Sequence, residues 1–277
     1  MKRRSKVIYM CCLCALIIVF LVSATALILY YAQSQKSQTT YNNLASIVDA
    51  ARSTAPTLVD DISNSAEDET VPSPFTTVTD PEGNPIQVLR EYAAAYQLNP
   101  HMVGWITIDG TNINYPVVQT PESPDYYLRR DFYGKRDTHG CVYAEEYCDI
   151  NKPSDNITLY GHRMRDGTMF AQLSNYESKE FWKSCPTIRF DTLFAHQTYQ
   201  IAYVFITESS VGQGFQYHTY ADFTDSADLQ EFIAQCESLA LYDTGVEIQP
   251  GDKLITLSTC DYSMENGRLV IVAKKIN

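Results

Sequence analysis

A cysteine and an arginine stand on either side of a short polar segment near the C-terminus. Cys260 ends the apolar, β-branched run 253–260, and Arg268 opens the run 268–272. Two such runs around a turn-prone segment predict an antiparallel hairpin with Cys260 and Arg268 roughly opposite each other. A guanidinium beside a thiol favours the thiolate, and it can bind the oxyanion that forms when a thiolate attacks a carbonyl carbon. The pair therefore predicts acyl transfer, with Cys260 as nucleophile and Arg268 as oxyanion stabiliser.

Acyl transfer by a thiol also needs a group that passes a proton to the leaving amine, and histidine suits this task at neutral pH. Among the five histidines, only His162 directly follows a strong strand candidate, residues 156–160. We expect Gly161 to end that strand and let the backbone turn, which places the imidazole at the rim of a barrel. His162 is therefore predicted as the proton-transfer partner.

Two other functions fit these residues. One is a papain-like hydrolase, although enzymes of that type carry the cysteine ahead of the histidine, whereas here His162 precedes Cys260. The other is a surface-displayed binding domain that kept the fold and lost the activity. Peptide cleavage that depends on Cys260 separates an enzyme from such a domain.

The elements expected to position these residues are mostly short strands. An Asp-Gly between residues 103–108 and 113–118 predicts a hairpin, and residues 226–241 predict one long helix capped by Asp225 or Ser226. An amphipathic helix is expected before Pro100. Many short strands with few helices favour a barrel or a sandwich. The further strand candidates are residues 140–143, 156–160, 187–190, 198–206, 253–259 and 269–273.

The N-terminal residues predict a membrane anchor. Residues 7–32 carry no charge and are long enough to span a bilayer, and the basic residues ahead of them predict a cytoplasmic tail over 1–6 with the rest of the chain outside the cell. A cleaved signal peptide is the alternative, but its apolar region would be shorter. Residues 33–84 read as an extracellular linker with a short helix over 41–52, and residues 85–277 as one catalytic domain.

The charge and the cysteine content of the chain limit which ligands and partners are expected. The net charge is −12, and the first 31 residues carry four basic and no acidic side chains, so the rest of the chain is more acidic still and nucleic acid is not expected as a partner. Five of the eight cysteines follow the anchor, and they include no CxxC pair that would suggest a zinc site. Cys141 and Cys148 are close enough in sequence for a disulfide, and the sequence leaves that pairing open. We predict no metal and no cofactor.

Three segments resemble the signature segments of class B sortases: residues 256–260 (Thr-Leu-Ser-Thr-Cys), residues 160–164 (Tyr-Gly-His-Arg-Met) and Gly267-Arg268, in the family's order. Residues 103–106, 113–119 and 127–128 resemble the opening strands of that class. The resemblance implies an eight-stranded sortase-type β-barrel with an N-terminal helix and a long helix before the cysteine strand.

The resemblance also implies a reaction. Cys260 would cleave a C-terminal sorting signal after a threonine, hold the acyl group as a thioester, and release it to an amine of a peptidoglycan precursor or crossbridge, or to a pilin lysine. The partners implied are sorting-signal-bearing surface proteins and the cytoplasmic membrane. Leu128, Ser258 and Asp261 would bind the sorting peptide. Residues 123–125 (Ser-Pro-Asp) depart from the family, which usually has an asparagine there.

The aromatic residues between positions 214 and 220 are expected to form an ordinary surface cluster, because the chain has twenty tyrosines. We therefore place none of them at the site.

Overall fold

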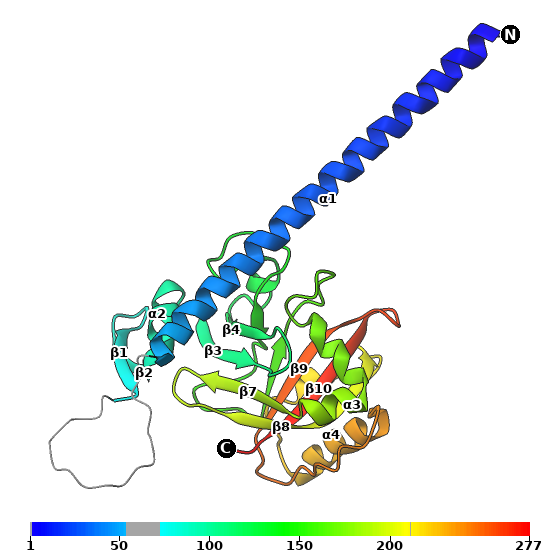
Figure 1. The fold of residues 1–277 in the computed structure, drawn as a ribbon. Helices are drawn as coiled ribbons and strands as arrows, with labels where there is room; N and C mark the ends of the chain where they lie inside the picture. The colour runs from blue at the N-terminus through cyan, green and yellow to red at the C-terminus, as the bar shows by residue number, and fades with distance from the viewer. Residues whose placement is uncertain (1, 54–72, 211) are drawn as a thin grey trace. The chain divides into compact units, whose positions relative to one another are not determined.

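The computed structural model describes residues 2–53, 73–210 and 212–277 (Figure 1). The chain divides into two compact units, Met1–Thr40 and Tyr41–Asn277.

A single helix, α1 (Lys2–Ser53), contains the apolar run predicted to span the membrane. Among the described residues, it is the one helix long and apolar enough for this, over Tyr9–Ser53. Residues 33–40, expected as a polar tether, are helical too. The hydroxyls of Thr39 and Thr40 donate to the carbonyls of Gln35 and Lys36, at 2.8 and 3.1 Å. These side chains are satisfied by the preceding turn of the helix, so polar composition does not interrupt it.

The second unit begins well before residue 85, which corrects the predicted domain boundary. The predicted short helix over 41–52 is the end of α1, and Tyr41, Leu44 and Val48 are buried in the main core. Strand β1 (Phe75–Thr79) lies inside the predicted linker and pairs antiparallel with β2 (Pro85–Leu89). The remainder of that linker, residues 54–72, lies outside the described residues.

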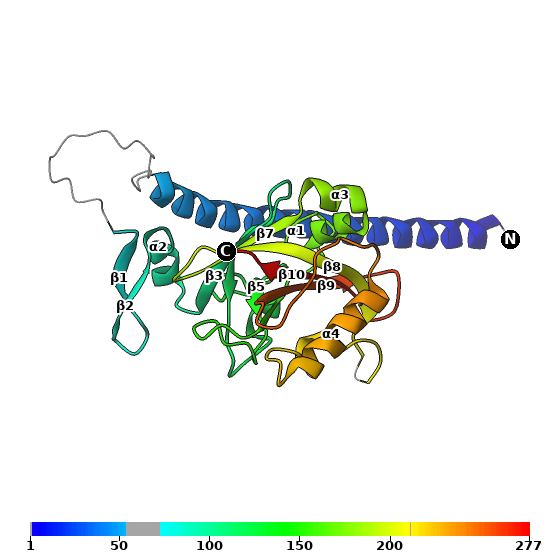
Figure 2. The same cartoon turned by 90° about the horizontal axis from the view of Figure 1, so that it is seen from below.

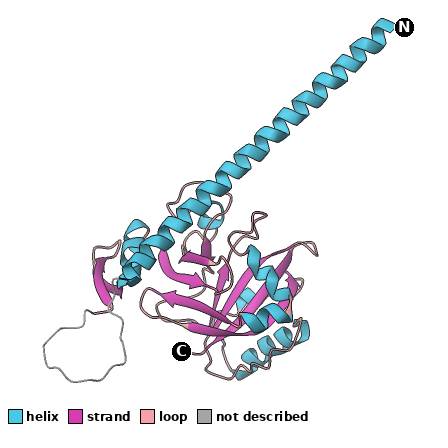
Figure 3. Ribbon diagram, viewed as in Figure 1, coloured by secondary structure: helices cyan, strands magenta, loops and turns pink. Residues whose placement is uncertain are grey.

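Eight strands close a barrel in the order β10-β8-β7-β3-β4-β5-β6-β9, which confirms the predicted architecture (Figure 3). The β4–β5 and β6–β9 pairs are parallel and the others are antiparallel. The strands are β3 (Met102–Thr107), β4 (Asn114–Val118), β5 (Val142–Ala144), β6 (Asn156–Tyr160), β7 (Thr187–Thr192), β8 (Thr198–Glu208), β9 (Leu254–Asp261) and β10 (Gly267–Lys275).

Helices lie between and beside these strands. The amphipathic helix expected before Pro100 is α2 (Arg90–Leu98), and the long helix before the cysteine strand is α4 (Ser226–Leu239). The Asp225 carboxylate caps α4 by accepting from the backbone N–H groups of Ala227 and Asp228, as predicted. The remaining helices are η1 (Tyr126–Arg129), η2 (Ala171–Glu177), α3 (Lys179–Ser184) and η3 (Tyr217–Thr219).

The two faces of β9 and β10 pack into different clusters. Ile255, Leu257 and Leu269 belong to the main core, whereas Leu254 and Val270 pack with α4 in a second cluster, called here the α4 cluster. Figure 2 shows α4 alongside the part of the barrel that contains β8 and β9. Because side chains alternate between the two faces of a strand, every even-numbered position of β9 and β10 faces the α4 side.

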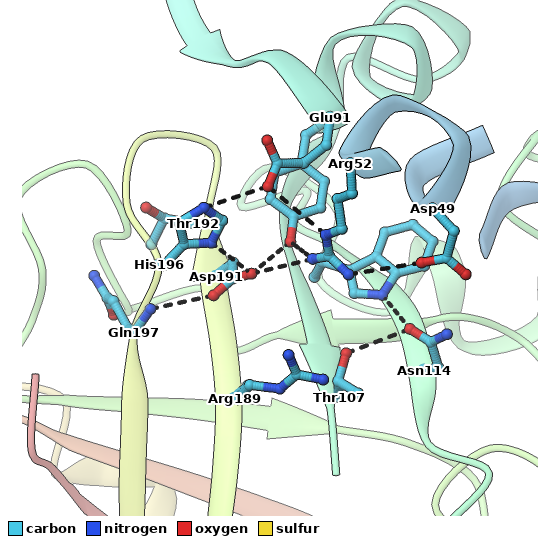
Figure 4. Close-up of polar contacts among 12 residues, drawn as sticks. Asp49, Arg52, Glu91, Thr107, Asn114, Arg189, Asp191, Thr192, His196 and Gln197 are labelled. Atoms are coloured by element: carbon cyan, nitrogen blue, oxygen red, sulfur yellow. Dashed lines mark hydrogen bonds and ion pairs between the residues drawn. The ribbon is translucent and has the colours of Figure 1, made fainter. Parts of the chain in front are cut away.

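A polar network joins the end of α1 to the barrel (Figure 4). The Arg52 guanidinium donates to the Tyr92 hydroxyl at 2.5 Å, and Tyr92 donates to the Asp191 carboxylate at 2.6 Å. The His196 ring bridges Asp191 at 3.0 Å and Glu91 at 3.3 Å. The hydrogen bond to Asp191 raises the pKa of His196 above 6.5. For Asp191, burial opposes ionisation, but the bonds from His196 and Tyr92 hold its pKa below 3.8.

We predict that His196→Gln flattens the pH dependence of stability. Because the folded-state pKa of His196 is raised, its contribution is fully present below pH 6.5 and is lost as the pH rises through the folded value. The imidazole is 58% exposed, so screening limits this to less than about 1 kcal/mol. Urea unfolding from about pH 5.5 to about pH 8.5 measures the difference. An identical pH dependence in both proteins contradicts the assignment.

Candidate active site

Strand β9 lies between β10, which carries Arg268, and β6, which ends two residues before His162. It pairs antiparallel with β10, where Cys260 is opposite Arg268, as predicted. On its other edge it pairs parallel with β6, where Ser258 is opposite Tyr160. His162 follows Tyr160 by two residues, just as Cys260 follows Ser258. The three predicted residues therefore meet at one end of the barrel, where β9 and β10 run side by side in Figure 1.

The contact between β6 and β9 continues to the residue next to His162. The Gly161 N–H donates to the Ser258 carbonyl at 3.2 Å, and the Thr259 hydroxyl donates to the Gly161 carbonyl at 2.8 Å. Cys260 occupies an even-numbered position and is half-buried, so its thiol lies on the α4 side of the barrel wall and outside the main core. This placement leaves the sulfur accessible to a substrate.

The His162 imidazole is held by backbone. Its Nε2 lies 2.7 Å from the Leu128 carbonyl oxygen, and its own carbonyl accepts from the Phe170 N–H at 2.9 Å. Since a carbonyl only accepts, Nε2 carries a hydrogen and Nδ1 is the nitrogen left to exchange a proton. Gly140 packs against the same Leu128 carbonyl at a φ of +61°, where a Cβ would come within 2.5 Å of that oxygen. Only glycine fits this position without moving the histidine's partner.

The environment of His162 favours its neutral form. Burial lowers the pKa of His162 below 6.5, the bond to Leu128 opposes this, and the positive charges of Arg129 and His139 lower it further. At neutral pH the imidazole can therefore accept a proton.

β6 ends at Tyr160, directly before Gly161, as predicted, but the backbone there does not use the conformational freedom of glycine. The φ of Gly161 is not among the positive values of the chain. A Cβ at this position would come within 2.5 Å of the Phe170 ring, so glycine allows the ring to pack against the strand end. Close approach is what Gly161 provides.

Arg268 is half-buried at the start of β10, and its Nη1 donates to the Gly267 carbonyl at 3.0 Å. Burial raises the pKa of Tyr217 above 10.0, the hydrogen bond with Ser258 and the charge of Arg268 oppose this, and negative charge on Glu145 or Cys260 adds to it.

The aromatic residues around position 217 are not a surface cluster, which corrects the prediction. Phe215 and Tyr217 are 7% and 2% exposed and belong to the α4 cluster. The Tyr217 hydroxyl lies 2.6 Å from the Ser258 hydroxyl. Ser258, predicted to bind the sorting peptide, is only 1% exposed. Its hydroxyl faces Tyr217 and not the solvent. Because side chains alternate along a strand, the sequence could have indicated that Ser258 lies on the same face of β9 as Cys260.

Asp261, also predicted to bind the peptide, is 5% exposed. Its carboxylate accepts from the Arg163 guanidinium at 2.7 Å and from the Ser263 N–H at 2.9 Å. Burial opposes ionisation of Asp261, but the bonds from Ser263 and Arg163 hold its pKa below 3.8. The ion pair with Arg163 joins the histidine segment to the cysteine hairpin.

Next to Ser258, strands β5 and β6 carry two tyrosines that sequence reasoning missed. Tyr143 is opposite Tyr160, and their ring centroids are 5.4 Å apart. The Tyr160 hydroxyl donates to Glu145, and burial raises the pKa of Glu145 to about 7. Both tyrosines are half-buried. We call this pair of rings, of which Tyr160 is opposite Ser258 on β9, the tyrosine floor.

A buried histidine joins the two segments that flank His162. His139 is 0% exposed, and its ring nitrogens lie 3.0 Å from Asp137 and 2.8 Å from Asp166. Burial alone would lower the pKa of His139, but the bonds to both carboxylates outweigh it and hold the pKa above 6.5. Asp166 belongs to the loop after His162, and the Asp137 N–H donates to the Arg129 carbonyl at 3.0 Å, next to Leu128. No local sequence pattern points to this bridge, because Asp166 is 27 residues away from His139 in the chain.

Cys141 and Cys148 are free thiols in different surroundings. The Cys141 sulfur lies 3.3 Å from the Tyr41 hydroxyl, and the Cys148 sulfur accepts from the Thr158 N–H at 3.4 Å. Over residues 2–53, 73–210 and 212–277, no three His, Cys, Asp or Glu side chains are grouped so that they could hold a metal ion.

We predict that His139→Leu lowers kcat by about 10- to 100-fold with less change in KM, because it frees the loop that orients His162. Loss of the neighbouring positive charge also raises the pKa of His162, so the acid limb of the pH–rate profile moves to higher pH. His139→Gln, which can still donate to one carboxylate, should be intermediate.

Steady-state kinetics against pH measure both effects, with circular dichroism to verify folding. His218→Gln is the matched control. A folded His139→Leu protein with wild-type kcat and pH profile would show that the loops position His162 without this bridge.

Comparisons with known proteins agree on one family. Residues 106–276 match the model of the sortase domain. The chain is 32% identical to sortase B of Listeria monocytogenes over 193 residues, which is 69% of this chain and 76% of that protein. It is 29% identical to sortase B of Staphylococcus aureus over 191 residues, which is 68% of this chain and 76% of that protein.

Solved structures share the architecture. The crystal structure of sortase B from Bacillus anthracis in complex with AAEK1 superposes with a TM-score of 0.68 at 28% identity, covering 89% of this chain and 99% of that one. A Staphylococcus aureus sortase B–substrate complex has the same fold, with a TM-score of 0.71 at 24% identity over 89% of this chain and 99% of that one.

Proposed function

We propose that this chain, which belongs to the sortase family of cysteine transpeptidases and to its class B, cleaves a C-terminal sorting signal after threonine and transfers the protein to an amine of cell-wall peptidoglycan. The single observation that carries the proposal is the double pairing of β9, which sets Cys260 opposite Arg268 and level with His162. Family membership also decides against a papain-like hydrolase.

The first half of the reaction makes the thioester. The Cys260 thiol gives its proton to His162 Nδ1 and its sulfur attacks the threonine carbonyl carbon. A C–S bond forms as the electron pair of the C=O π bond moves to oxygen. Arg268, which stands opposite Cys260, donates to that oxyanion. As the oxyanion collapses, the C–N bond breaks and the leaving amine takes a proton from His162 Nδ1. The products are a thioester on Cys260 and a free amine.

The second half reverses the sequence with another amine. The acceptor nitrogen attacks the thioester carbonyl, His162 Nδ1 takes its proton, and the C–S bond breaks to release the Cys260 thiolate. The lowered pKa of His162 suits this step, because the imidazole must be neutral to accept the proton. The bond from Nε2 to the Leu128 carbonyl keeps the ring in the tautomer that the step requires.

For the sorting peptide we propose a path along the floor made by Tyr143 and Tyr160, with Leu128 at its edge. Ser258 and Asp261 support this path indirectly, since both are buried: Ser258 holds Tyr217, and Asp261 holds Arg163. The apolar part of α1 would anchor the enzyme in the cytoplasmic membrane, with the basic N-terminus inside and the barrel outside.

We predict that Cys260→Ala abolishes cleavage of a threonine-containing sorting peptide, because no other group can form the thioester. Peptide cleavage followed by chromatography is the measurement. Cys185→Ala, which removes another half-buried free thiol, is the matched control and should keep full activity. Turnover that survives in Cys260→Ala sinks the catalytic assignment, and a wild-type protein that binds the peptide without cleaving it favours an inactive binding domain.

We predict that Arg268→Lys lowers kcat/KM by about 100-fold or more. Lysine keeps the charge but loses the planar set of donors, one of which already bonds the Gly267 carbonyl. The same assay measures the loss, and Arg189→Lys on β7 is a control for the substitution itself. Near-normal activity in Arg268→Lys would reduce Arg268 to a structural residue.

A further inference from the structure

A positively charged run lies beside His162 on an otherwise acidic protein. The chain has a net charge of −12, yet the run 129–136 contains four cationic side chains, all exposed: Arg129, Arg130, Lys135 and Arg136. Among the described residues, none of the four has a carboxylate within ion-pair distance. Their charge is therefore not neutralised locally.

The acidic residues closest in sequence are turned away from these cations. Asp131 is 3% exposed and accepts from the backbone N–H groups of Tyr133 and Lys135, at 3.0 and 2.8 Å. Asp137 is also 3% exposed and bonds His139. Since both carboxylates are buried in other contacts, the surface of this segment presents positive charge alone.

Three of the four cations line a cavity of about 470 Å³. The Arg130 guanidinium lies 4.7 Å above the Tyr126 ring, and its Nη1 donates to the Gly134 carbonyl at 3.1 Å. These contacts hold its position before any ligand arrives. The single carboxylate in the lining, Asp125, accepts from the Tyr143 hydroxyl at 3.4 Å. The lining residues are Ser123, Asp125, Tyr126, Leu128, Arg129, Arg130 and Arg136.

This arginine pocket adjoins the base of the proposed reaction. Leu128 lines it, and the carbonyl of the same residue accepts the hydrogen bond from His162 Nε2 at 2.7 Å. The charge of Arg129 is felt at His162, where it lowers the pKa of the imidazole. A molecule whose amine reaches His162 is therefore next to the arginine pocket.

We propose that the arginine pocket binds an anionic group of the amine acceptor, a carboxylate or a phosphate. This inference rests on the proposed function and specifies its second substrate. The anion is held by charge-assisted hydrogen bonds from the guanidinium groups while the acceptor nitrogen attacks the Cys260 thioester. No bond to the anion forms or breaks, so it contributes binding and orientation only.

The acceptor is the substrate whose amine must approach His162 to lose its proton. The acyl group is by then bound to Cys260 on β9, whereas Leu128 lies on η1, which contacts β5, and β6 separates β5 from β9. The arginines thus fit the acceptor better than the sorting peptide. The same charge would also repel an amine that lacks an anion, which makes the pocket selective for acceptors carrying both groups.

The test compares matched acceptors in the full-length enzyme. Transfer of a sorting peptide to triglycine is measured against transfer to triglycinamide, which differs only in the missing carboxylate charge. We expect an apparent KM about tenfold lower for triglycine at low ionic strength, and a smaller ratio at about 0.5 M salt because screening weakens exposed charge pairs. N-acetyltriglycine, which has the carboxylate and no amine, should inhibit transfer to triglycinamide competitively.

Variants locate the effect. Arg136→Gln should reduce the triglycine preference about threefold, and Arg129→Gln combined with Arg136→Gln should bring it close to one. Arg189→Gln removes the same charge from β7, where Arg189 pairs with Asp109 at 3.2 Å, and should keep the wild-type preference. Comparing 2-aminoethyl phosphate with ethanolamine distinguishes a phosphate-bearing acceptor from a carboxylate-bearing one.

Two results would overturn this inference. One is an equal KM for the charged and the amidated acceptor in the wild type. The other is a loss of peptide cleavage in the arginine variants, measured without any amine, that equals their loss of transfer, since the pocket would then serve the sorting peptide. Failure of the proposed function looks different: the wild type would cleave no sorting peptide at all, with or without an acceptor.

Discussion

The geometry of the site depends on the register of one strand against two neighbours. β9 is antiparallel to β10 and parallel to β6, and both pairings are locked because the barrel is closed and neither edge is free. A slip by one residue would turn Cys260 toward the main core and Leu257 toward the α4 side. The apolar side chains of β9 resist such a slip, because alternate positions are buried in two different clusters. The packing of the barrel wall thus determines which way the Cys260 side chain points.

The three residues of the proposed catalytic site differ in how they are supported. Cys260 and Arg268 lie on paired strands, whose backbone hydrogen bonds fix them directly. His162 lies just past the end of β6 and depends on contacts from other segments, above all the Leu128 carbonyl and the His139 bridge between Asp137 and Asp166. The ion pair between half-buried Arg163 and buried Asp261 adds a direct connection between the histidine segment and the cysteine hairpin. The site therefore forms only when the strand pairing and the loop contacts are both in place.

Local charge at the site differs from the charge of the whole chain. The net charge of −12 affects solubility and long-range electrostatics. Within residues 129–136, however, every exposed charged side chain is cationic. The burial of Asp131 and Asp137 produces this difference, since both carboxylates are engaged inside the protein. Burial lowers the pKa of His162, and the charge of Arg129 lowers it further, so the basic run also affects the imidazole proposed for proton transfer.

Much of this fold follows from local sequence signals, and the hairpin that carries Cys260 and Arg268 is the clearest case. Its strands, its turn and its register were predicted from residues close together in the chain, as were β6 and the capped helix α4, because alternation, helical periodicity and turn residues act over short distances. The helical state of residues 33–40 and the strand at 75–79 were missed, since polar composition favours linkers only on average. The parallel pairing of β6 with β9, the partner of His162 and the burial of Ser258, Asp261 and Tyr217 were decided by the tertiary structure alone. Each of these joins residues far apart in the sequence, and such contacts depend on how the closed barrel brings distant segments together.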